Sequence, residues 1–108
     1  MFCKEAESAY RELMAGIEVK TLVHGEKTLM AKYRLKKGSQ LPEHSHPHEQ
    51  TGFLVSGQIR LYVGDDVLDA GPGDSWCIAG NVAHRAEVIE DAVAVEVFSP
   101  VREDFLSE

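Results

Sequence analysis

Three histidines and a glutamine stand close together in the segment HSHPHEQ at positions 44–50. Side chains two residues apart on a β-strand share a face, so His44 and His46 can bind one ion together. A straight strand would place Gln50 about 20 Å from His44, too far for metal bonds of about 2 Å. Pro47 cannot donate to a sheet, so we expect the chain to bend there, with His48 at the bend. Gln50 would then return on the next strand and face the same centre.

A fourth ligand for such a centre must come from a more distant strand. His84 is the candidate, because His24 belongs to a polar turn far upstream of the segment. An isolated His-x-His pair is also compatible with a surface coincidence that binds nothing. The wider pattern of the chain must therefore decide between these two interpretations.

Nine short segments with β-forming residues, separated by turn residues, are the elements that must position this centre. Their close spacing is typical of an all-β sandwich or barrel, and no helices separate them as a parallel α/β fold would require. Ser56-Gly57 predicts a tight hairpin, and Glu90-Asp91 predicts a second turn. Glu5–Met14 is expected to form a short N-terminal helix or an extended segment. The expected strands are Ile17–His24, Thr28–Leu35, Glu43–His46, Gln50–Val55, Gln58–Val63, Val67–Ala70, Ser75–Ile78, Val82–Ile89 and Ala92–Phe98.

The composition bounds the class of protein. A chain of 108 residues with 44% hydrophobic residues is expected to fold as one domain. Its formal charge of −7 argues against nucleic acid or an anionic membrane as a partner, because both attract positive charge. No apolar run approaches the ~20 residues of a membrane span, and the N-terminus lacks a signal-peptide core. We therefore expect a soluble cytoplasmic protein.

The spacing of these residues resembles the two sequence motifs of the cupin superfamily. The first motif, G-x5-H-x-H-x3-E-x6-G, is matched over residues 38–57, with glutamine where glutamate usually stands. The second, G-x5-P-x-G-x2-H-x3-N, is matched over residues 73–88 by its first glycine and its histidine. Asn81 replaces the second glycine and tolerates a left-handed turn. The resemblance implies a single cupin domain over residues 1–108, folded as an antiparallel double-stranded β-helix, or jelly-roll barrel.

The same resemblance implies one divalent transition metal ion. Its implied ligands are His44, His46, Gln50 and His84. All four are neutral, so the site would keep a net charge near +2 and would suit Lewis-acid chemistry on an anionic substrate. Three imidazoles and one amide are compatible with zinc, nickel, iron or manganese.

A narrower resemblance extends over nearly the whole chain. The segment at 44–50 and the ending FSPVREDFL at 98–106 are similar to the pectin-degradation cupins of the KdgF type. This resemblance implies an isomerase that converts cyclic 4,5-unsaturated uronates from pectin or alginate into linear 5-keto-4-deoxyuronate, by ring opening and ketonisation. It implies a small anionic sugar as substrate. It also implies a homodimer, which would cover short exposed strands.

Three residues near the C-terminus are candidates for catalysis and substrate binding. Glu96 and Phe98 have the same parity on the last strand, and a carboxylate among apolar neighbours is costly unless it is paired or used. The resemblance implies a catalytic acid at position 96, where the family carries aspartate; the alternative is a glutamate that faces solvent on an edge strand. Arg102 is expected to act in catalysis and to bind the substrate carboxylate, or else to pair with Glu103 or Asp104. Phe98 is expected to pack against the sugar, unless it belongs to the core.

Two other functions fit the same pocket. One is a different cupin metalloenzyme, such as a dioxygenase or another sugar isomerase. The other is a cupin that binds a sugar or metabolite without catalysis. The ending around Glu96 and Arg102 separates the uronate isomerase from these two, and an active Glu96→Gln variant would contradict the acid–base role.

Overall fold

The computed structural model describes residues 1–5 and 9–106, which form an antiparallel β-structure. A 3-10 turn, Glu103–Phe105, follows the last strand. The described part of the chain contains no helix that is long and apolar enough to cross a membrane. The strands are β1 (Arg11–Met14), β2 (Ile17–His24), β3 (Leu29–Leu35), β4 (Gln40–His44), β5 (Glu49–Val63), β6 (Asp66–Ala70), β7 (Ser75–Ile78) and β8 (His84–Ser99).

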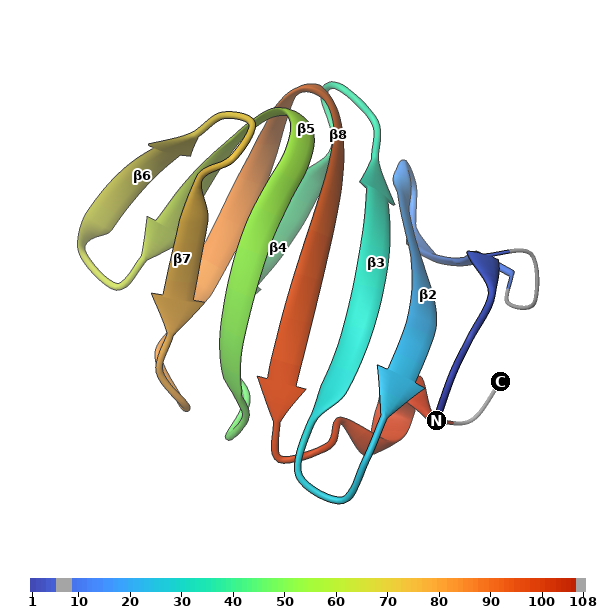
Figure 1. Ribbon diagram of the computed structural model, residues 1–108. Coiled ribbons are helices and arrows are strands. Elements are labelled where there is room, and N and C mark those ends of the chain that lie inside the picture. Colours follow the sequence, from blue (N-terminus) through green and yellow to red (C-terminus); the bar gives the residue numbers. More distant parts are fainter. Residues whose placement is uncertain (6–8, 107–108) are drawn as a thin grey trace.

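Two long strands, β5 and β8, run through both layers of the fold. Figure 1 shows β7, β5, β8, β3 and β2 side by side in the front layer, with β4 behind them. β6 and β4 pair with the halves of β5 and β8 that continue into the rear layer. β5 and β8 pair with each other from Glu49 opposite Ser99 to Val63 opposite His84. The predicted jelly-roll fold is thus confirmed, and the two long strands connect its layers.

Ser56-Gly57 is a bend within β5 and not the predicted hairpin turn. The register of β5 against β8 shifts here, as it does at a β-bulge. Gly57 has φ +89°, and a Cβ on it would overlap Ala92 and the carbonyl oxygen of Asp91 on β8. The predicted turn at Glu90-Asp91 is likewise a continuous part of β8. A positive φ is typical of a hairpin turn, but here it allows a bend within one strand. The four strands expected on either side of the two predicted turns are therefore two continuous strands, β5 and β8.

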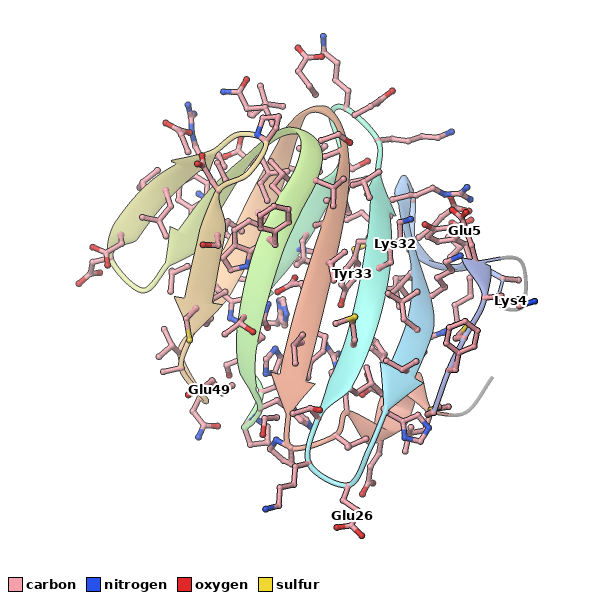
Figure 2. All side chains as sticks on the ribbon, viewed as in Figure 1. Lys4, Glu5, Glu26, Lys32, Tyr33 and Glu49 are labelled. Carbon is pink, nitrogen blue, oxygen red and sulfur yellow. The ribbon has the colours of Figure 1, made fainter. Side chains whose placement is uncertain are left out.

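The described part of the N-terminal segment is extended, which is one of its two predicted conformations. Arg11–Met14 is strand β1 and pairs with β2, whereas residues 6–8 of the predicted helix lie outside the described residues. The guanidinium of Arg34 lies 3.8 Å from the ring centre of Tyr10. Figure 2 shows Glu5 near Lys32, with 3.9 Å between Oε1 and Nζ. The segment therefore covers part of the outer surface of β2 and β3.

The core lies between the two layers and has two clusters. The larger is built on β5 and β8, and the smaller contains the rings of Phe98 and Phe105, whose centres lie 5.6 Å apart. Side chains of both clusters also border a cavity of about 280 Å³. Because the cavity lies between the layers, residues from β3, β4, β5, β7 and β8 all reach it.

Candidate metal centre and adjoining cavity

Three histidines converge where β4 meets β8. His44 ends β4 and stands directly opposite His84, the first residue of β8. His46 follows in the connection, and the chain bends at Pro47 and His48 before β5 begins, as predicted. The ring of His84 lies 4.2 Å from that of His44 and 5.1 Å from that of His46, between ring centres. One ring nitrogen from each of the three histidines lies within 4.8 Å of the others.

Hydrogen bonds to the backbone orient the three imidazoles. The Nδ1 atom of each lies 2.8–3.0 Å from a carbonyl oxygen two residues away in the chain. If Nδ1 carries the proton and donates it there, Nε2 keeps its lone pair, as a metal ligand must. Nε2 of His46 and of His84 is buried without a hydrogen-bond partner in the described residues. Burial lowers the pKa of both rings, which favours the neutral form that binds metals. The cluster could therefore hold a metal ion.

Gln50 connects this cluster to a carboxyl group. It is buried near the start of β5, and its Nε2 donates to Oε2 of Glu96 over 2.5 Å. Its Oε1 is buried and has no hydrogen-bond partner in residues 1–5 and 9–106. An unpaired amide oxygen on a residue that lines the same cavity as His44 and His84 fits the predicted fourth ligand, which stays a prediction.

Glu96 faces the interior of the molecule. β8 lies between β3 and β5, so the alternative of a solvent-facing glutamate on an edge strand is wrong. Its Oε2 also accepts a hydrogen bond from Nε1 of Trp76 over 3.3 Å. Burial raises the pKa of Glu96 to about 7, because desolvation outweighs the two hydrogen bonds and the positive charge of Arg102. A carboxyl that titrates near neutrality is suited to both accepting and donating a proton.

The predicted site residues surround one cavity with mostly apolar walls. Of these residues, only His46 does not line the cavity. Its ring lies next to that of Phe98, with 6.0 Å between the two ring centres. Phe98 belongs to the core and also borders the cavity. The core position that was its predicted alternative is therefore compatible with a place next to the cavity. The predicted residues that line the cavity are His44, Gln50, His84, Glu96, Phe98 and Arg102.

Arg102 both lines the cavity and pairs with Asp104. Its Nε and Nη2 donate to the two carboxylate oxygens of Asp104 over 3.1 and 2.9 Å. The guanidinium also lies 5.0 Å from the ring centre of Phe98 and 4.1 Å from that of Phe105. Its Nη1 makes no hydrogen bond to the described residues, which leaves donors for another anion. Asp104 therefore orients Arg102 without using all of its donors.

Two further cavity residues, Trp76 and Tyr33, are not among the predicted site residues. Tyr33 lies on β3 beside β8 (Figure 2), and burial raises the pKa of its phenol well above the ordinary value. A tyrosine within an alternating strand has no feature that distinguishes it from a core residue. Trp76 shares its parity with the buried Ile78, which was the available signal that it faces inward.

Comparisons with known proteins agree with this architecture. A family model described as the cupin domain matches residues 31–100. The pectin degradation protein KdgF of Dickeya dadantii (strain 3937) is 26% identical over 102 residues, which is 93% of each chain. The structure of KdgF from Halomonas sp. matches with a TM-score of 0.92 and 25% identity over 98% of both chains. An RmlC-like cupin from Shewanella frigidimarina matches equally well, with a TM-score of 0.92 and 25% identity over 97% of this chain and 95% of that one. The chain belongs to the cupin family.

Proposed function

We propose that this chain is a metal-dependent cytoplasmic enzyme that converts cyclic 4,5-unsaturated uronates from pectin or alginate breakdown into linear 5-keto-4-deoxyuronates. The observation that carries the proposal is the desolvated carboxyl of Glu96 in a cavity that is also lined by Arg102 and by two of the three clustered histidines, His44 and His84. Similarity to two KdgF proteins over nearly the whole chain supports pectin-derived sugars as the substrate class.

The size and lining of the cavity suit a single sugar ring. A volume of about 280 Å³ lies just below the roughly 300–1,000 Å³ of ligand pockets, which favours a monosaccharide over an oligosaccharide. Phe98 offers an apolar surface to the ring. Arg102 would bind the sugar carboxylate through the donors that Asp104 leaves unused.

His44, His46 and His84, together with Oε1 of Gln50, would hold the divalent transition metal. When bound, the metal would supply a Lewis acid that polarises the sugar oxygens. The four neutral ligands cancel none of its charge. This local positive charge and Arg102 would offset the repulsion between an anionic sugar and a protein of formal charge −7.

The isomerisation needs one proton to move from oxygen to carbon. Glu96 would take the proton of the anomeric hydroxyl, the C1–O5 bond would break, and C1 would become an aldehyde. The electrons of the broken bond remain on O5 as an enolate conjugated with the C4–C5 double bond. Glu96 would then give the proton to C4 as the C5 ketone forms. Atoms and electrons balance without an oxidant, and Arg102 would hold the carboxylate attached to C5.

We also propose that the chain forms a homodimer through the outer face of the front layer. Alternation along β5 and β8 turns Phe53, Val55, Val95 and Val97 outward, and Phe53 and Val55 are 48% and 49% exposed. Four strands about 4.8 Å apart, with six residues each at about 3.4 Å, give a face of roughly 20 by 20 Å. A second copy of the same apolar face is the partner that this surface fits.

The test of the enzymatic proposal is the decay of the absorbance of a 4,5-unsaturated monouronate. We expect metal-loaded protein to accelerate the decay over buffer and a chelator to abolish the acceleration, with the linear keto sugar identified by NMR. Glu96→Gln should be inactive, while Glu26→Gln in an exposed turn serves as the matched control. No acceleration by metal-loaded protein would refute the proposal. Sugar binding without turnover would instead favour a non-catalytic binding cupin.

A further inference from the structure

We infer that Trp76 is a positioning residue that lies across Gly52 and fixes the Glu96 carboxyl, so that Oε1 of Glu96 is the oxygen left free to meet the substrate. The inference rests on the proposed function, which makes Glu96 the acid–base group. It adds the residue that orients this group, Trp76, and the carboxyl oxygen that meets the substrate, Oε1.

The three residues form one row across three strands of the front layer. Gly52 on β5 is the register partner of Trp76 on β7 at one side and of Glu96 on β8 at the other. Figure 1 shows β5 between β7 and β8. Backbones two strands apart are separated by about 10 Å, so the outer side chains of a row meet only if one crosses the central strand.

Gly52 allows this crossing because it has no side chain. A Cβ on Gly52 would overlap Nε1 and Cε2 of the Trp76 indole, so the ring lies directly on the backbone of β5. From there Nε1 reaches Oε2 of Glu96 over 3.3 Å. Any larger residue at position 52 would displace the ring from this path. The glycine is thus required by the contact between its two neighbours.

Both hydrogen bonds to the carboxyl fall on the same oxygen. Nε2 of Gln50 and Nε1 of Trp76 both donate to Oε2, and no donor among residues 1–5 and 9–106 reaches Oε1. Two N–H donors occupy Oε2, so Oε1 is the oxygen of this carboxyl that keeps its acceptor positions free. The free oxygen of a carboxyl that lines the cavity is then the one that meets the substrate.

The length of the glutamate side chain explains why the carboxyl must be restrained. Glutamate has one more rotatable bond than aspartate, so its carboxyl samples more orientations unless it is held. An indole is rigid and has two side-chain torsions, so it restrains the carboxyl at little entropic cost to itself. Trp76 and Gln50 together select one orientation of Glu96.

The first arm of the test does not depend on activity. Trp76 is the single tryptophan of the chain, so its fluorescence reports the contact directly. We expect the emission to change in Glu96→Ala and in Gly52→Ala. The matched control is Gly25→Ala, where an added Cβ meets no atom within 4 Å, and it should leave the emission unchanged. Unchanged emission in Glu96→Ala would overturn the inferred contact.

The second arm is kinetic and uses Trp76→Phe, which keeps an aromatic ring and removes the N–H donor. We expect kcat to fall about 10-fold or more, with KM within about 3-fold and the bound metal unchanged, because the lost bond orients the reacting carboxyl. A wild-type kcat in this variant would overturn the inference. So would a parallel loss of metal and a rise in KM, which indicate a structural role. Absence of turnover by the wild-type protein would instead refute the proposed function, and the fluorescence arm would still decide whether Trp76 holds Glu96.

Discussion

Replacing Glu96 by glutamine is expected to stabilise the metal-free protein at pH 8 while it abolishes turnover. The carboxyl is buried, and its pKa rises from the ordinary 4.5 to about 7. A raised pKa of an acid means that the folded state holds the proton more tightly than the unfolded state. The stability from this proton is therefore fully present below about pH 4.5 and is lost as the pH rises to about 7. Glutamine stays neutral at every pH, and its amide oxygen still accepts hydrogen bonds from Gln50 and Trp76.

The size of the effect follows from the pKa shift. A rise from 4.5 to about 7 corresponds to about 3 kcal/mol of unfolding free energy lost at high pH. Denaturant unfolding with a chelator, at pH 5 and pH 8, measures it in the wild type, in Glu96→Gln and in the control Glu26→Gln. We expect Glu96→Gln to be more stable than the wild type by about 3 kcal/mol at pH 8 and by under about 1 kcal/mol at pH 5. The same pH dependence in Glu96→Gln and the wild type would refute the assignment of a raised pKa to this group.

Four further predictions follow from other contacts. Arg102→Lys keeps the charge but loses the planar fork, so steady-state kinetics should show KM for the uronate raised about 10-fold or more, and an unchanged KM would contradict carboxylate binding. Gln50→Glu should bind the metal more tightly in a chelator competition, because it adds a negative ligand, yet turn over more slowly because it no longer donates to the carboxyl beside it. Phe53→Lys should convert the proposed dimer to a monomer in sedimentation velocity; a dimer that persists would place the interface elsewhere. Gly57→Ala should lower the unfolding free energy by about 2 kcal/mol or more in denaturant titrations, because its Cβ meets the backbone of β8; wild-type stability would contradict the strained bend.

The side-chain parity of the site was predictable because alternation is a local property. Their spacing predicted that His44 and His46 converge, which they do, although β4 ends at His44 and His46 lies in the connection; the bend at Pro47 follows from the chemistry of proline. The same parity placed Glu96 on one face of its strand. It could not show whether that strand lay at an edge, because strand order depends on pairings between residues distant in the chain.

The bend at Ser56-Gly57 was not predictable for a different reason. A glycine with positive φ is required both by a tight hairpin and by a bulge in a continuous strand, so the local sequence is the same for both. The backbone of Asp91 and Ala92, which packs against Gly57, decides between them. The contact between Trp76 and Glu96 could not be predicted either, because it depends on the register of the three strands β7, β5 and β8.

The continuous pairing of β5 with β8 also has a consequence for how the protein matures. Glu49 pairs with Ser99 and Val63 with His84, so this ladder joins chain positions far apart, and we expect it to form more slowly than a local hairpin. The histidine cluster needs the same alignment, because His84 begins β8 while its partners precede β5. An ion cannot guide the early steps of folding if its ligands are still apart, so it would enter a barrel that is already closed. The rate at which metal-loaded protein appears after synthesis would then be set by strand alignment, and extra metal in the medium would not raise it.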